Sequence, residues 1–304
     1  MRKNRLPVHG WVAFDKPLGM TSTQAVGKIR WLFNAAKAGH GGTLDPLATG
    51  LLPIALGEAT KTVSLAMDGR KIYRFTVAWG AETTTDDLEG DVTSRSDTRP
   101  SQNDIESVLK IFDGEIMQAP PAFSAIKVDG ERAYDLARAG DTVELAARPV
   151  RIDSLRCIEV PDASHATFEV ACGKGTYVRS LARDMGRALG CLGHVVMLRR
   201  IAVGPLTEAH MISLEKLEEL SHKAPGGNAM EGALLPIETV LDGIPALAVG
   251  EGEAQRLRQG QFVPLGGENV HSAQEAVLVT SGTIPVGICA IEQGTLKPKR
   301  LFNL

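Results

Sequence analysis

The sequence predicts an α+β fold, and three observations support this class. Stretches typical of strands and stretches typical of helices are mixed along the chain without a strict strand–helix–strand alternation, which favours α+β over a doubly wound sheet. Hydrophobic residues make up 43% of the chain and charged residues 23%, an ordinary composition for a globular protein that buries a sizeable core. At 304 residues the chain is long enough for about two domains.

The first quarter of the chain contains three predicted strands and one helix. Two of the strands are short apolar runs, and the third alternates between apolar and polar residues, so that Tyr73 and Phe75 share one face. Thr21 or Ser22 caps a helix whose apolar residues recur every 3.6 residues, and we expect this helix to end near Gly39. The predicted strands cover residues 10–15, 51–56 and 71–79.

The remaining elements follow from the same signals. Ser101 and Asp104 form a capping box ahead of a helical stripe, and Gly190 closes a helix that starts near Arg179. The other predicted segments are a polar, acidic loop at 80–91, an excursion from the main body at 118–151, strands within 151–172, a surface loop at 221–232 and a small glycine-rich β domain at 250–304.

The most informative stretch is GHGGTLDPLATG at residues 39–50, which we predict to be a loop because of its four glycines and one proline. Asp45 precedes Pro46, which biases the aspartate toward an extended conformation, and the glycines allow a ligand to approach the backbone. Two interpretations remain open from the loop alone. Asp45 either presents a reactive carboxylate or caps a neighbouring backbone amide.

Two other groups of residues have similar alternatives. Arg179 lies directly before the predicted helix, and Arg183 and Arg187 follow at i+4 and i+8 on one face. Arg183 and Arg187 either contact phosphates or form a solvated basic stripe. Tyr73 is either a functional ring or a core aromatic beside Phe75, and periodicity alone favours the core.

Several classes of protein are excluded by composition and motifs. The formal net charge is −3, so any interaction with nucleic acid must rest on local basic clusters. We expect no cofactor and no metal, because the chain has no P-loop, no GxGxxG motif and no plausible metal cluster. The N-terminus does not resemble a signal peptide and no apolar run is long enough to span a membrane, which predicts a cytoplasmic protein. No two of the cysteines have CxxC spacing, and we expect them to be reduced core residues: Cys157, Cys172, Cys191 and Cys289.

Seven blocks of the sequence, in register over most of residues 10–205, resemble the TruB-type tRNA pseudouridine synthases of bacteria. The blocks are DKPLGMTS (15–22), GHGGTLDPLATGLLPIALGEATK (39–61), KIYRF (71–75), GAETTTDDLEG (80–90), QAPPAFSAIKVDGERAYDLAR (118–138), GTYVRSLARDMG (175–186) and HVVMLRR (194–200).

The resemblance implies a fold and a set of site residues. It implies a catalytic domain at 1–243 with a mixed, largely antiparallel sheet flanked by helices, in which about 124–152 form a mobile RNA clamp. It also implies a small β-barrel-like, RNA-binding PUA domain at 244–304. By resemblance Asp45 is the catalytic aspartate, Tyr73 stacks on the target base and Arg179 pairs with the aspartate. The substrate-binding residues implied are His40, which helps to turn out the nucleotide, Lys61 and Leu198, which line the pocket, and Tyr177, Arg183, Lys127 and Arg132.

The activity implied is the isomerisation of uridine 55 in the T-loop of tRNA to pseudouridine. This reaction breaks and remakes a glycosidic bond without oxidation or loss of a group, so it needs no cofactor. A carboxylate can attack the sugar or stabilise positive charge on it, as in glycoside hydrolysis, once the base has been flipped out of its stack. We expect the T-stem-loop of tRNA as partner, no guide RNA and no membrane, and a monomer.

Three alternatives are weighed against this function. The first is a relative that depends on a guide RNA, although such proteins usually carry lysine-rich extensions and this chain ends with only KPKR before its last four residues. The second is an RNA-binding or RNA-folding protein without essential catalysis, which the joint presence of Asp45, Tyr73 and Arg179 argues against. The third is a hydrolase with an isolated aspartate, for which the sequence offers no second acid at recognisable spacing.

Overall fold

The computed structural model describes residues 5–304 except 125, 129, 139–144, 224–229 and 267–272. In this part of the chain ten strands form one large sheet, in the order β14-β1-β3-β12-β4-β11-β10-β7, with β13 paired to β12 and β2 paired to β3. The strands are β1 (Gly10–Lys16), β2 (Ala38–His40), β3 (Ala48–Leu56), β4 (Lys71–Trp79), β7 (Gly114–Gln118), β10 (Arg148–Asp162), β11 (His165–Cys172), β12 (Gly193–Val203), β13 (Leu206–Thr207) and β14 (Ile212–Ser213).

The large sheet is mixed and mostly antiparallel, as predicted. Among the described strands of this sheet, only β1–β14 and β12–β3 pair in parallel. Two small hairpins extend from it, β5 (Ala81–Thr83) with β6 (Val92–Arg95) and β8 (Lys127–Val128) with β9 (Glu131–Arg132). The helices of this region are α1 (Ser22–Leu32), α2 (Val63–Asp68), α3 (Gln102–Leu109), α4 (Ala133–Arg138), α5 (Val178–Ala188) and α6 (Leu214–Lys223), and the 3-10 turns are η1 (Gly57–Thr62), η2 (Lys110–Phe112), η3 (Glu208–His210), η4 (Glu231–Ala233) and η5 (Ile237–Leu241).

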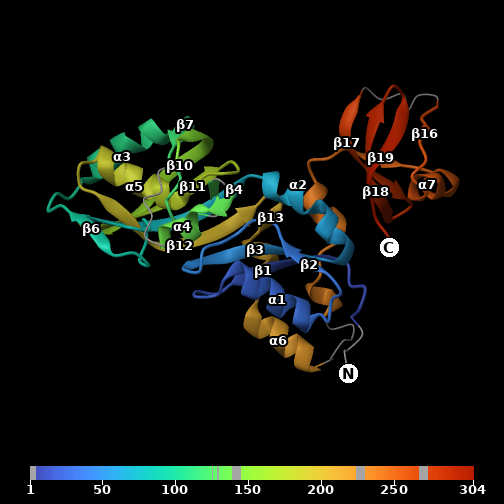
Figure 1. Ribbon diagram of the computed structural model, residues 1–304, viewed down its shortest axis with the longest axis horizontal. Helices are drawn as coiled ribbons and strands as arrows, with labels where there is room; N and C mark the ends of the chain where they lie inside the picture. Colours follow the sequence, from blue (N-terminus) through green and yellow to red (C-terminus); the bar gives the residue numbers. More distant parts are fainter. Residues whose placement is uncertain (1–4, 125, 129, 139–144, 224–229, 267–272) are drawn as a thin grey trace.

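Helices cover the two halves of the large sheet separately, as Figure 1 shows. Around β4 and β11, the side chains of α3 and α5 pack on one buried cluster that includes Phe75 and Phe168. Around β1 and β3, the side chains of α1 and α6 pack on a second cluster that includes Phe14 and Ile54. Tyr73 and Leu198 are half-buried and contact both clusters, so they mark the junction between the two halves.

The strands β1 and β3 are buried on both faces, which explains their continuous apolar sequence. Val12 of β1 faces α1 and α6, whereas Trp11 and Ala13 belong to a third cluster on the opposite side. That third cluster contains side chains of η5 and three side chains of the C-terminal region: Leu278, Ile288 and Phe302.

The C-terminal region forms a separate five-stranded sheet among the described residues, and Figure 1 shows it beside the large sheet. It is a small curled sheet with one helix, consistent with the predicted PUA-like unit, and the predicted α+β class is confirmed. Its strand order is β15-β17-β18-β19-β16, formed by β15 (Ala246–Ala248), β16 (Val263–Pro264), β17 (Gln274–Ser281), β18 (Ile284–Glu292) and β19 (Thr295–Leu301), with α7 at Glu251–Arg258.

Local predictions were wrong at three places. The first helix ends at Leu32, because Phe33 caps it and Asn34 adopts a left-handed φ of 47°. The predicted loop at 39–50 is partly strand: β2 pairs with the end of β3, and the start of β3 pairs with β12, which satisfies the backbone despite the glycines. The helix α7 was not predicted; it is a short polar segment whose two buried residues, Ala254 and Leu257, pack on the C-terminal sheet.

Candidate active site

The loop that carries Asp45 is held in place by polar contacts on three sides. The hydroxyl Oγ of Ser22 lies 2.9 Å from both the backbone N and the carbonyl O of Leu44. The ammonium Nζ of Lys16 donates to the carbonyl of Pro46 at 3.2 Å, and Arg200 donates to the carbonyl of Gly42 at 3.0 Å. Because the residues on both sides of Asp45 are anchored, its backbone has little freedom.

The carboxylate of Asp45 forms an ion pair with Arg179, the second residue of α5. The distance from Arg179 Nε to Asp45 Oδ2 is 2.9 Å, and the side chains are 7% and 40% exposed respectively. The remaining guanidinium nitrogens donate to the carbonyls of Thr85 (2.9 Å) and Phe123 (3.0 Å). A buried, fully engaged guanidinium therefore aims a half-exposed carboxylate.

This carboxylate opens onto a small cavity between α5, the start of β3 and β12. The cavity wall formed by β12 is apolar and includes Val195, Met197 and Leu198. Leu198 thus lines the same cavity as Asp45. An apolar wall facing one charged group suits a flat base with polar edges.

A second carboxylate at the cavity, that of Asp87, was not identified from the sequence. Its Oδ2 lies 3.7 Å from Arg179 Nε, and its side chain is 8% exposed. Asp87 Oδ1 accepts from the hydroxyl of Thr85 (2.5 Å) and the backbone N of Glu89 (3.0 Å). The run of threonines and acidic residues at 83–89 could have indicated it. Such polar residues are costly to bury unless they bond to one another, so the run suggests a polar network.

Tyr73 lies on β4 beside this cavity, although it is not among the cavity-lining residues. Its ring centroid is 6.0 Å from the guanidinium carbon of Arg200, and its hydroxyl bonds to that side chain. Burial raises the pKa of Tyr73, with Arg200 opposing the shift and Asp45 adding to it. The phenol is therefore neutral at physiological pH and lies within electrostatic range of the Asp45 carboxylate.

Two buried cations, Lys16 and Arg200, also belong to the site and were not predicted as such. The Lys16 side chain is fully buried, and burial lowers its pKa to about 8, with Asp45 opposing the shift and Arg200 adding to it. Arg200 is 1% exposed and donates to the carbonyls of Leu51 (2.7 Å), Gly42 and Thr43. Both cations bond mainly to backbone carbonyls, so they brace the loop around Asp45.

His40 ends the short strand β2, next to the Asp45 loop. Its pKa is lowered by burial and by the charge of Arg200. Among the described residues its Nδ1 has no hydrogen-bond partner. A neutral, half-buried ring at this place is compatible with the expected contact with a nucleotide.

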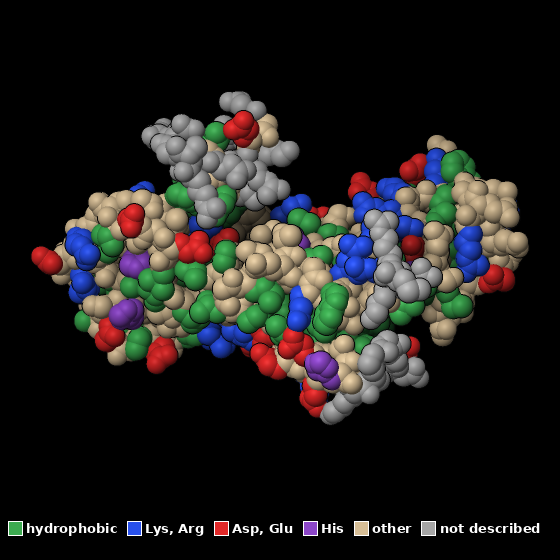
Figure 2. Space-filling model, turned by 60° about the horizontal axis from the view of Figure 1, so that its bottom comes forward, with side chains coloured by type: hydrophobic (Ala, Val, Ile, Leu, Met, Phe, Trp, Pro, Cys, Tyr) green, Lys and Arg blue, Asp and Glu red, His purple; other side chains and the backbone are tan. Residues whose placement is uncertain are grey.

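Lys61 is not at the predicted position, since it does not line the Asp45 cavity. It lies in η1, forms an ion pair with Glu58 at 2.6 Å and donates to the carbonyl of Leu301 at 2.7 Å. With Lys299 and Arg300 it lines a different, open cavity where the C-terminal sheet meets the rest of the molecule, a place where Figure 2 shows basic side chains gathered. The resemblance placed Lys61 near the pocket, but η1, which follows β3, turns away from the Asp45 loop.

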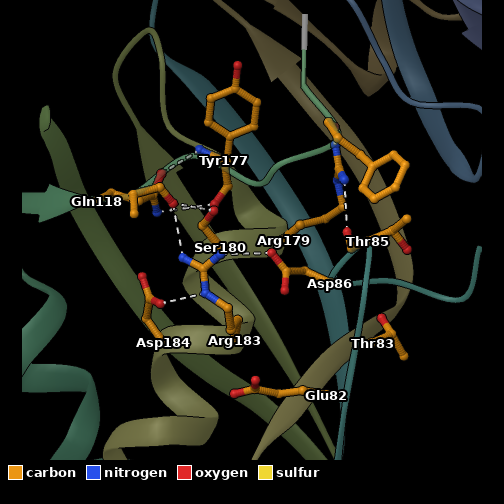
Figure 3. A network of polar contacts seen from close by, with 12 residues as sticks. Glu82, Thr83, Thr85, Asp86, Gln118, Tyr177, Arg179, Ser180, Arg183 and Asp184 are labelled. Atoms are coloured by element: carbon orange, nitrogen blue, oxygen red, sulfur yellow. Dashed lines mark hydrogen bonds and ion pairs between the residues drawn. The ribbon is translucent and has the colours of Figure 1, made fainter. Parts of the chain in front are cut away.

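Arg183 lies on α5, and Tyr177 is the residue just before this helix, as Figure 3 shows. Gln118 holds the Tyr177 backbone through its amide, accepting from N at 2.8 Å and donating to O at 3.2 Å, and the Tyr177 ring lies 5.7 Å from the Arg148 guanidinium carbon. Arg183 points inward, with its side chain 11% exposed and its guanidinium paired to Asp86 and Asp184 at 2.9 Å each. This placement favours a structural role for Arg183 over the predicted contact with phosphate.

The side chains of Lys127 and Arg132 lie outside what the structure describes. Their backbones pair with each other across the β8–β9 hairpin. Among the described residues no group of three or more His, Cys, Asp and Glu side chains is arranged to hold a metal. No described helix is long and apolar enough to cross a membrane. The four cysteines are free thiols, three of them buried and Cys157 half-buried.

Known proteins resemble the chain along almost its whole length. Family models match three consecutive segments: TruB family pseudouridylate synthase (N terminal domain) at residues 30–178, tRNA pseudouridylate synthase B C-terminal domain at 179–242, and Pseudouridine synthase II TruB, C-terminal, at 245–302.

Relatives and solved structures agree with these matches. A tRNA pseudouridine synthase B of Bradyrhizobium diazoefficiens is 55% identical over 100% of this chain and 88% of its own length. One of Brucella melitensis is 55% identical over 99% of this chain and 98% of its own length. A chain in the crystal structure of a Cbf5-Nop10-Gar1 complex is 26% identical, has a TM-score of 0.74 and covers 97% of this chain and 85% of that one. The matches along the whole chain, together with the fold and the aspartate–arginine site, show that the chain belongs to the TruB family of pseudouridylate synthases.

Proposed function

We propose that this protein isomerises uridine 55 in the T-loop of tRNA to pseudouridine, without a guide RNA. The observation that carries the proposal is the Asp45–Arg179 ion pair, which presents a half-exposed carboxylate to a cavity with an apolar wall. The relatives named tRNA pseudouridine synthase B, 55% identical over the full chain, support tRNA as the substrate. We also propose that the protein acts as a monomer in the cytoplasm, the compartment that holds tRNA.

The residues of the site suit each step of this isomerisation. The bond from the ribose C1′ to N1 of uracil breaks, and positive charge develops on the sugar. Asp45 either attacks the ribose or stabilises this charge, and Arg179 keeps its carboxylate aimed through charge-assisted hydrogen bonds. The released base turns and forms a new bond from C1′ to its C5; C5 then loses a proton and N1 gains one.

The groups around the carboxylate handle the base. The uridine must leave its stack in the RNA before Asp45 can reach its ribose, at a cost of a few kcal/mol. The neutral ring of His40 and the aromatic face of Tyr73 can contact the extruded nucleotide, and such stacking is worth roughly 1–3 kcal/mol per base. The neutral hydroxyl of Tyr73 is a candidate to carry the final proton.

A guide-dependent activity is the second candidate, because the Cbf5 complex shares the fold at a TM-score of 0.74. The 26% identity to that chain is much lower than the 55% identity to the tRNA pseudouridine synthase B relatives. This difference favours an enzyme that acts on tRNA without additional RNA.

The experiment is to incubate the purified protein with an unmodified tRNA transcript and to map pseudouridine. We expect product at position 55 without any guide RNA. Asp45→Asn keeps the shape of the side chain but removes its charge, so we expect a rate at least about 10³-fold lower with tRNA affinity retained. The matched control is Asp97→Asn, at an exposed position outside the site. Turnover by Asp45→Asn close to that of the control would contradict the proposal.

A further inference from the structure

Three arginines of α5 connect the helix to the acidic segment Glu82–Asp87, which runs antiparallel to it. Arg187 Nε lies 2.6 Å from Glu82 Oε1, and Arg183 Nη1 lies 2.9 Å from Asp86 Oδ2. Arg179, the last of the series toward the cavity, donates to the Thr85 carbonyl and approaches Asp87. The spacing of four residues places the arginines one helical turn apart, so they form three rungs between the two segments.

The rungs differ in burial, and this difference decides how strongly each one fixes the geometry. The side chains of Arg179 and Arg183 are 7% and 11% exposed, whereas that of Arg187 is 56% exposed. The carboxylates are buried alike, at 10% for Glu82 and 9% for Asp86, so the outer pair differs in that its guanidinium reaches water. An ion pair buried at both ends is costly to break, while a pair whose cation is exposed is partly screened by water. The rung of Arg183 is thus the inner support closest to Arg179.

The Arg183 rung holds the same two segments that Arg179 depends on. Arg179 bonds to carbonyls at Thr85 and Phe123, and Arg183 bonds to the Asp86 carboxylate and to the carbonyl of Ala119 at 3.0 Å. Each arginine therefore spans from the acidic segment to the segment that follows β7 (Figure 3). Arg183, one turn further along α5, therefore bonds to the same two segments that orient Arg179.

Asp86 is placed so that its displacement would move both partners of Arg179 in the acidic segment. It lies between Thr85 and Asp87 and adopts a left-handed φ of 61°, which is uncommon for a residue with a side chain. Its backbone is fixed by Asp86 N donating to Thr83 O (3.2 Å) and by Val195 N donating to Asp86 O (3.0 Å). The remaining support is the carboxylate's bond to Arg183.

We propose that Asp86 and Arg183 are positioning residues, whose buried ion pair sets the acidic segment against α5 so that Arg179 keeps the Asp45 carboxylate aimed at the substrate. This inference rests on the proposed function. It assigns to Arg183 a role in the chemical step without contact with RNA.

The test compares the inner rung with the outer rung in the full-length protein. Asp86→Asn and the double variant Asp86→Asn/Arg183→Gln remove the inner pair, and Glu82→Gln/Arg187→Gln removes the outer pair as a matched control. Single-turnover rates at saturating enzyme and dissociation constants for a tRNA transcript are measured for each. Misplacement of a catalytic group by a fraction of an ångström to 1 Å lowers the rate strongly, so we expect the inner variants to be slower by about tenfold or more with tRNA affinity unchanged. We expect the outer variant to stay close to the wild-type rate.

Rescue separates positioning from general stability. Arg183→Lys keeps a cation near Asp86 and should retain more of the rate than Arg183→Gln, and thermal unfolding of each variant shows whether it is folded at the assay temperature. Wild-type rates in the inner variants, or equal losses of rate for both rungs that follow the loss of stability, would overturn the inference. Absence of product from the wild-type protein would overturn the proposed function, and this inference with it.

Discussion

The charged side chains of the site are buried to different degrees, and this divides their roles. Lys16 and Arg200 are fully buried and bond mainly to backbone carbonyls, so their function is to hold the chain. Arg179 is nearly as buried but faces a carboxylate. Asp45 is the exposed member of this group, at 40%, which leaves it free to reach a substrate. The positive charges thus form a fixed frame around one accessible negative charge.

Tyr73→Phe tests the role of a single hydroxyl. The substitution keeps the ring, which contacts both core clusters, and removes the oxygen that bonds to Arg200. We expect tRNA affinity to be unchanged and the single-turnover rate to fall by about 100-fold, as for loss of a proton-transfer group. The measurement is single-turnover formation of pseudouridine together with filter binding of the same transcript. An unchanged rate would remove the hydroxyl from the mechanism.

Asp86 gives the folded state a characteristic pH dependence. Burial raises its pKa from 3.8 to about 6, although Arg183, Arg179 and Arg187 oppose the shift; Glu82 adds to it. A carboxyl whose pKa is higher in the folded than in the unfolded state binds protons preferentially when folded, so it contributes less stability as pH rises from 4 to 6.

We therefore expect the stability difference between wild type and Asp86→Asn to change with pH. The free energy of unfolding of the wild type, relative to the variant, should fall by about 2 kcal/mol between pH 4 and pH 7. Urea unfolding at a series of pH values measures this difference. A difference that is constant with pH, or that rises, would show that the Arg183 pair outweighs burial.

At the scale of elements, the Asp45 loop joins β2 to β3 and is shaped by residues from outside it. Gly50 in β3 has a φ of 95°, and a Cβ there would meet the carbonyl of Arg200 at 2.2 Å. The close approach of β3 and β12 at this point allows Arg200 to reach back under the loop. The loop therefore depends on the strands and on α1 for its conformation.

Ser22→Ala tests how much one side-chain anchor contributes to the loop. The buried hydroxyl bonds to both backbone groups of Leu44, and its removal would leave two buried polar groups without their partner. We expect a loss of about 1–3 kcal/mol in the free energy of unfolding, together with a lower single-turnover rate because Leu44 adjoins Asp45. The control is Ser107→Ala on α3, whose exposed hydroxyl bonds only within its own helix. Equal stabilities of the two variants would show that the Ser22 anchor contributes little.

At the scale of the whole molecule, the C-terminal sheet shares a core with the catalytic part. Leu278, Ile288 and Phe302 belong to the same buried cluster as Trp11 and Leu206. Polar contacts reinforce this interface, including a bond from Asn303 N to Glu58 Oε2 at 2.8 Å. Truncation near residue 245 would expose this cluster, so a truncated chain would report on folding as well as on RNA affinity.

Phe302→Ala is the sharper test of that coupling. Its ring is 2% exposed within the shared cluster, and its truncation should lower the free energy of unfolding by about 3–5 kcal/mol. Because the cluster joins both sheets, we expect one cooperative transition that shifts as a whole. Phe262→Ala, at a ring that is 56% exposed, should change stability by less than about 1 kcal/mol. Two separate thermal transitions, with only one of them shifted, would contradict a shared core.

Some features of this molecule follow from short stretches of sequence. The alternation in 71–79 predicts β4, and the capping box of Ser101 and Asp104 is present at the start of α3. The four-residue spacing of Arg179, Arg183 and Arg187 correctly places them on one face of α5. These predictions succeed because the signal and the structure lie within a few residues of each other.

Other features required the tertiary structure. Asp86 and Glu82, which pair with Arg183 and Arg187, lie about 100 residues earlier in the chain, and the sequence alone could not distinguish them from phosphate or water as partners. Lys61 was predicted to line the pocket, but the turn of η1 carries it to the C-terminal sheet. Asp87, Lys16 and Arg200 were not identified because a buried charge is recognisable only when its surroundings are known.

The sequence by itself determined the family, the main strands and helices, and Asp45 as the candidate reactive group. The tertiary structure decided which charges face that carboxylate, which arginines are structural, and that the two sheets share a core. The physical reason is range: capping, periodicity and proline effects act over a few residues, whereas burial and ion pairing depend on which distant segments the fold brings within about 4 Å.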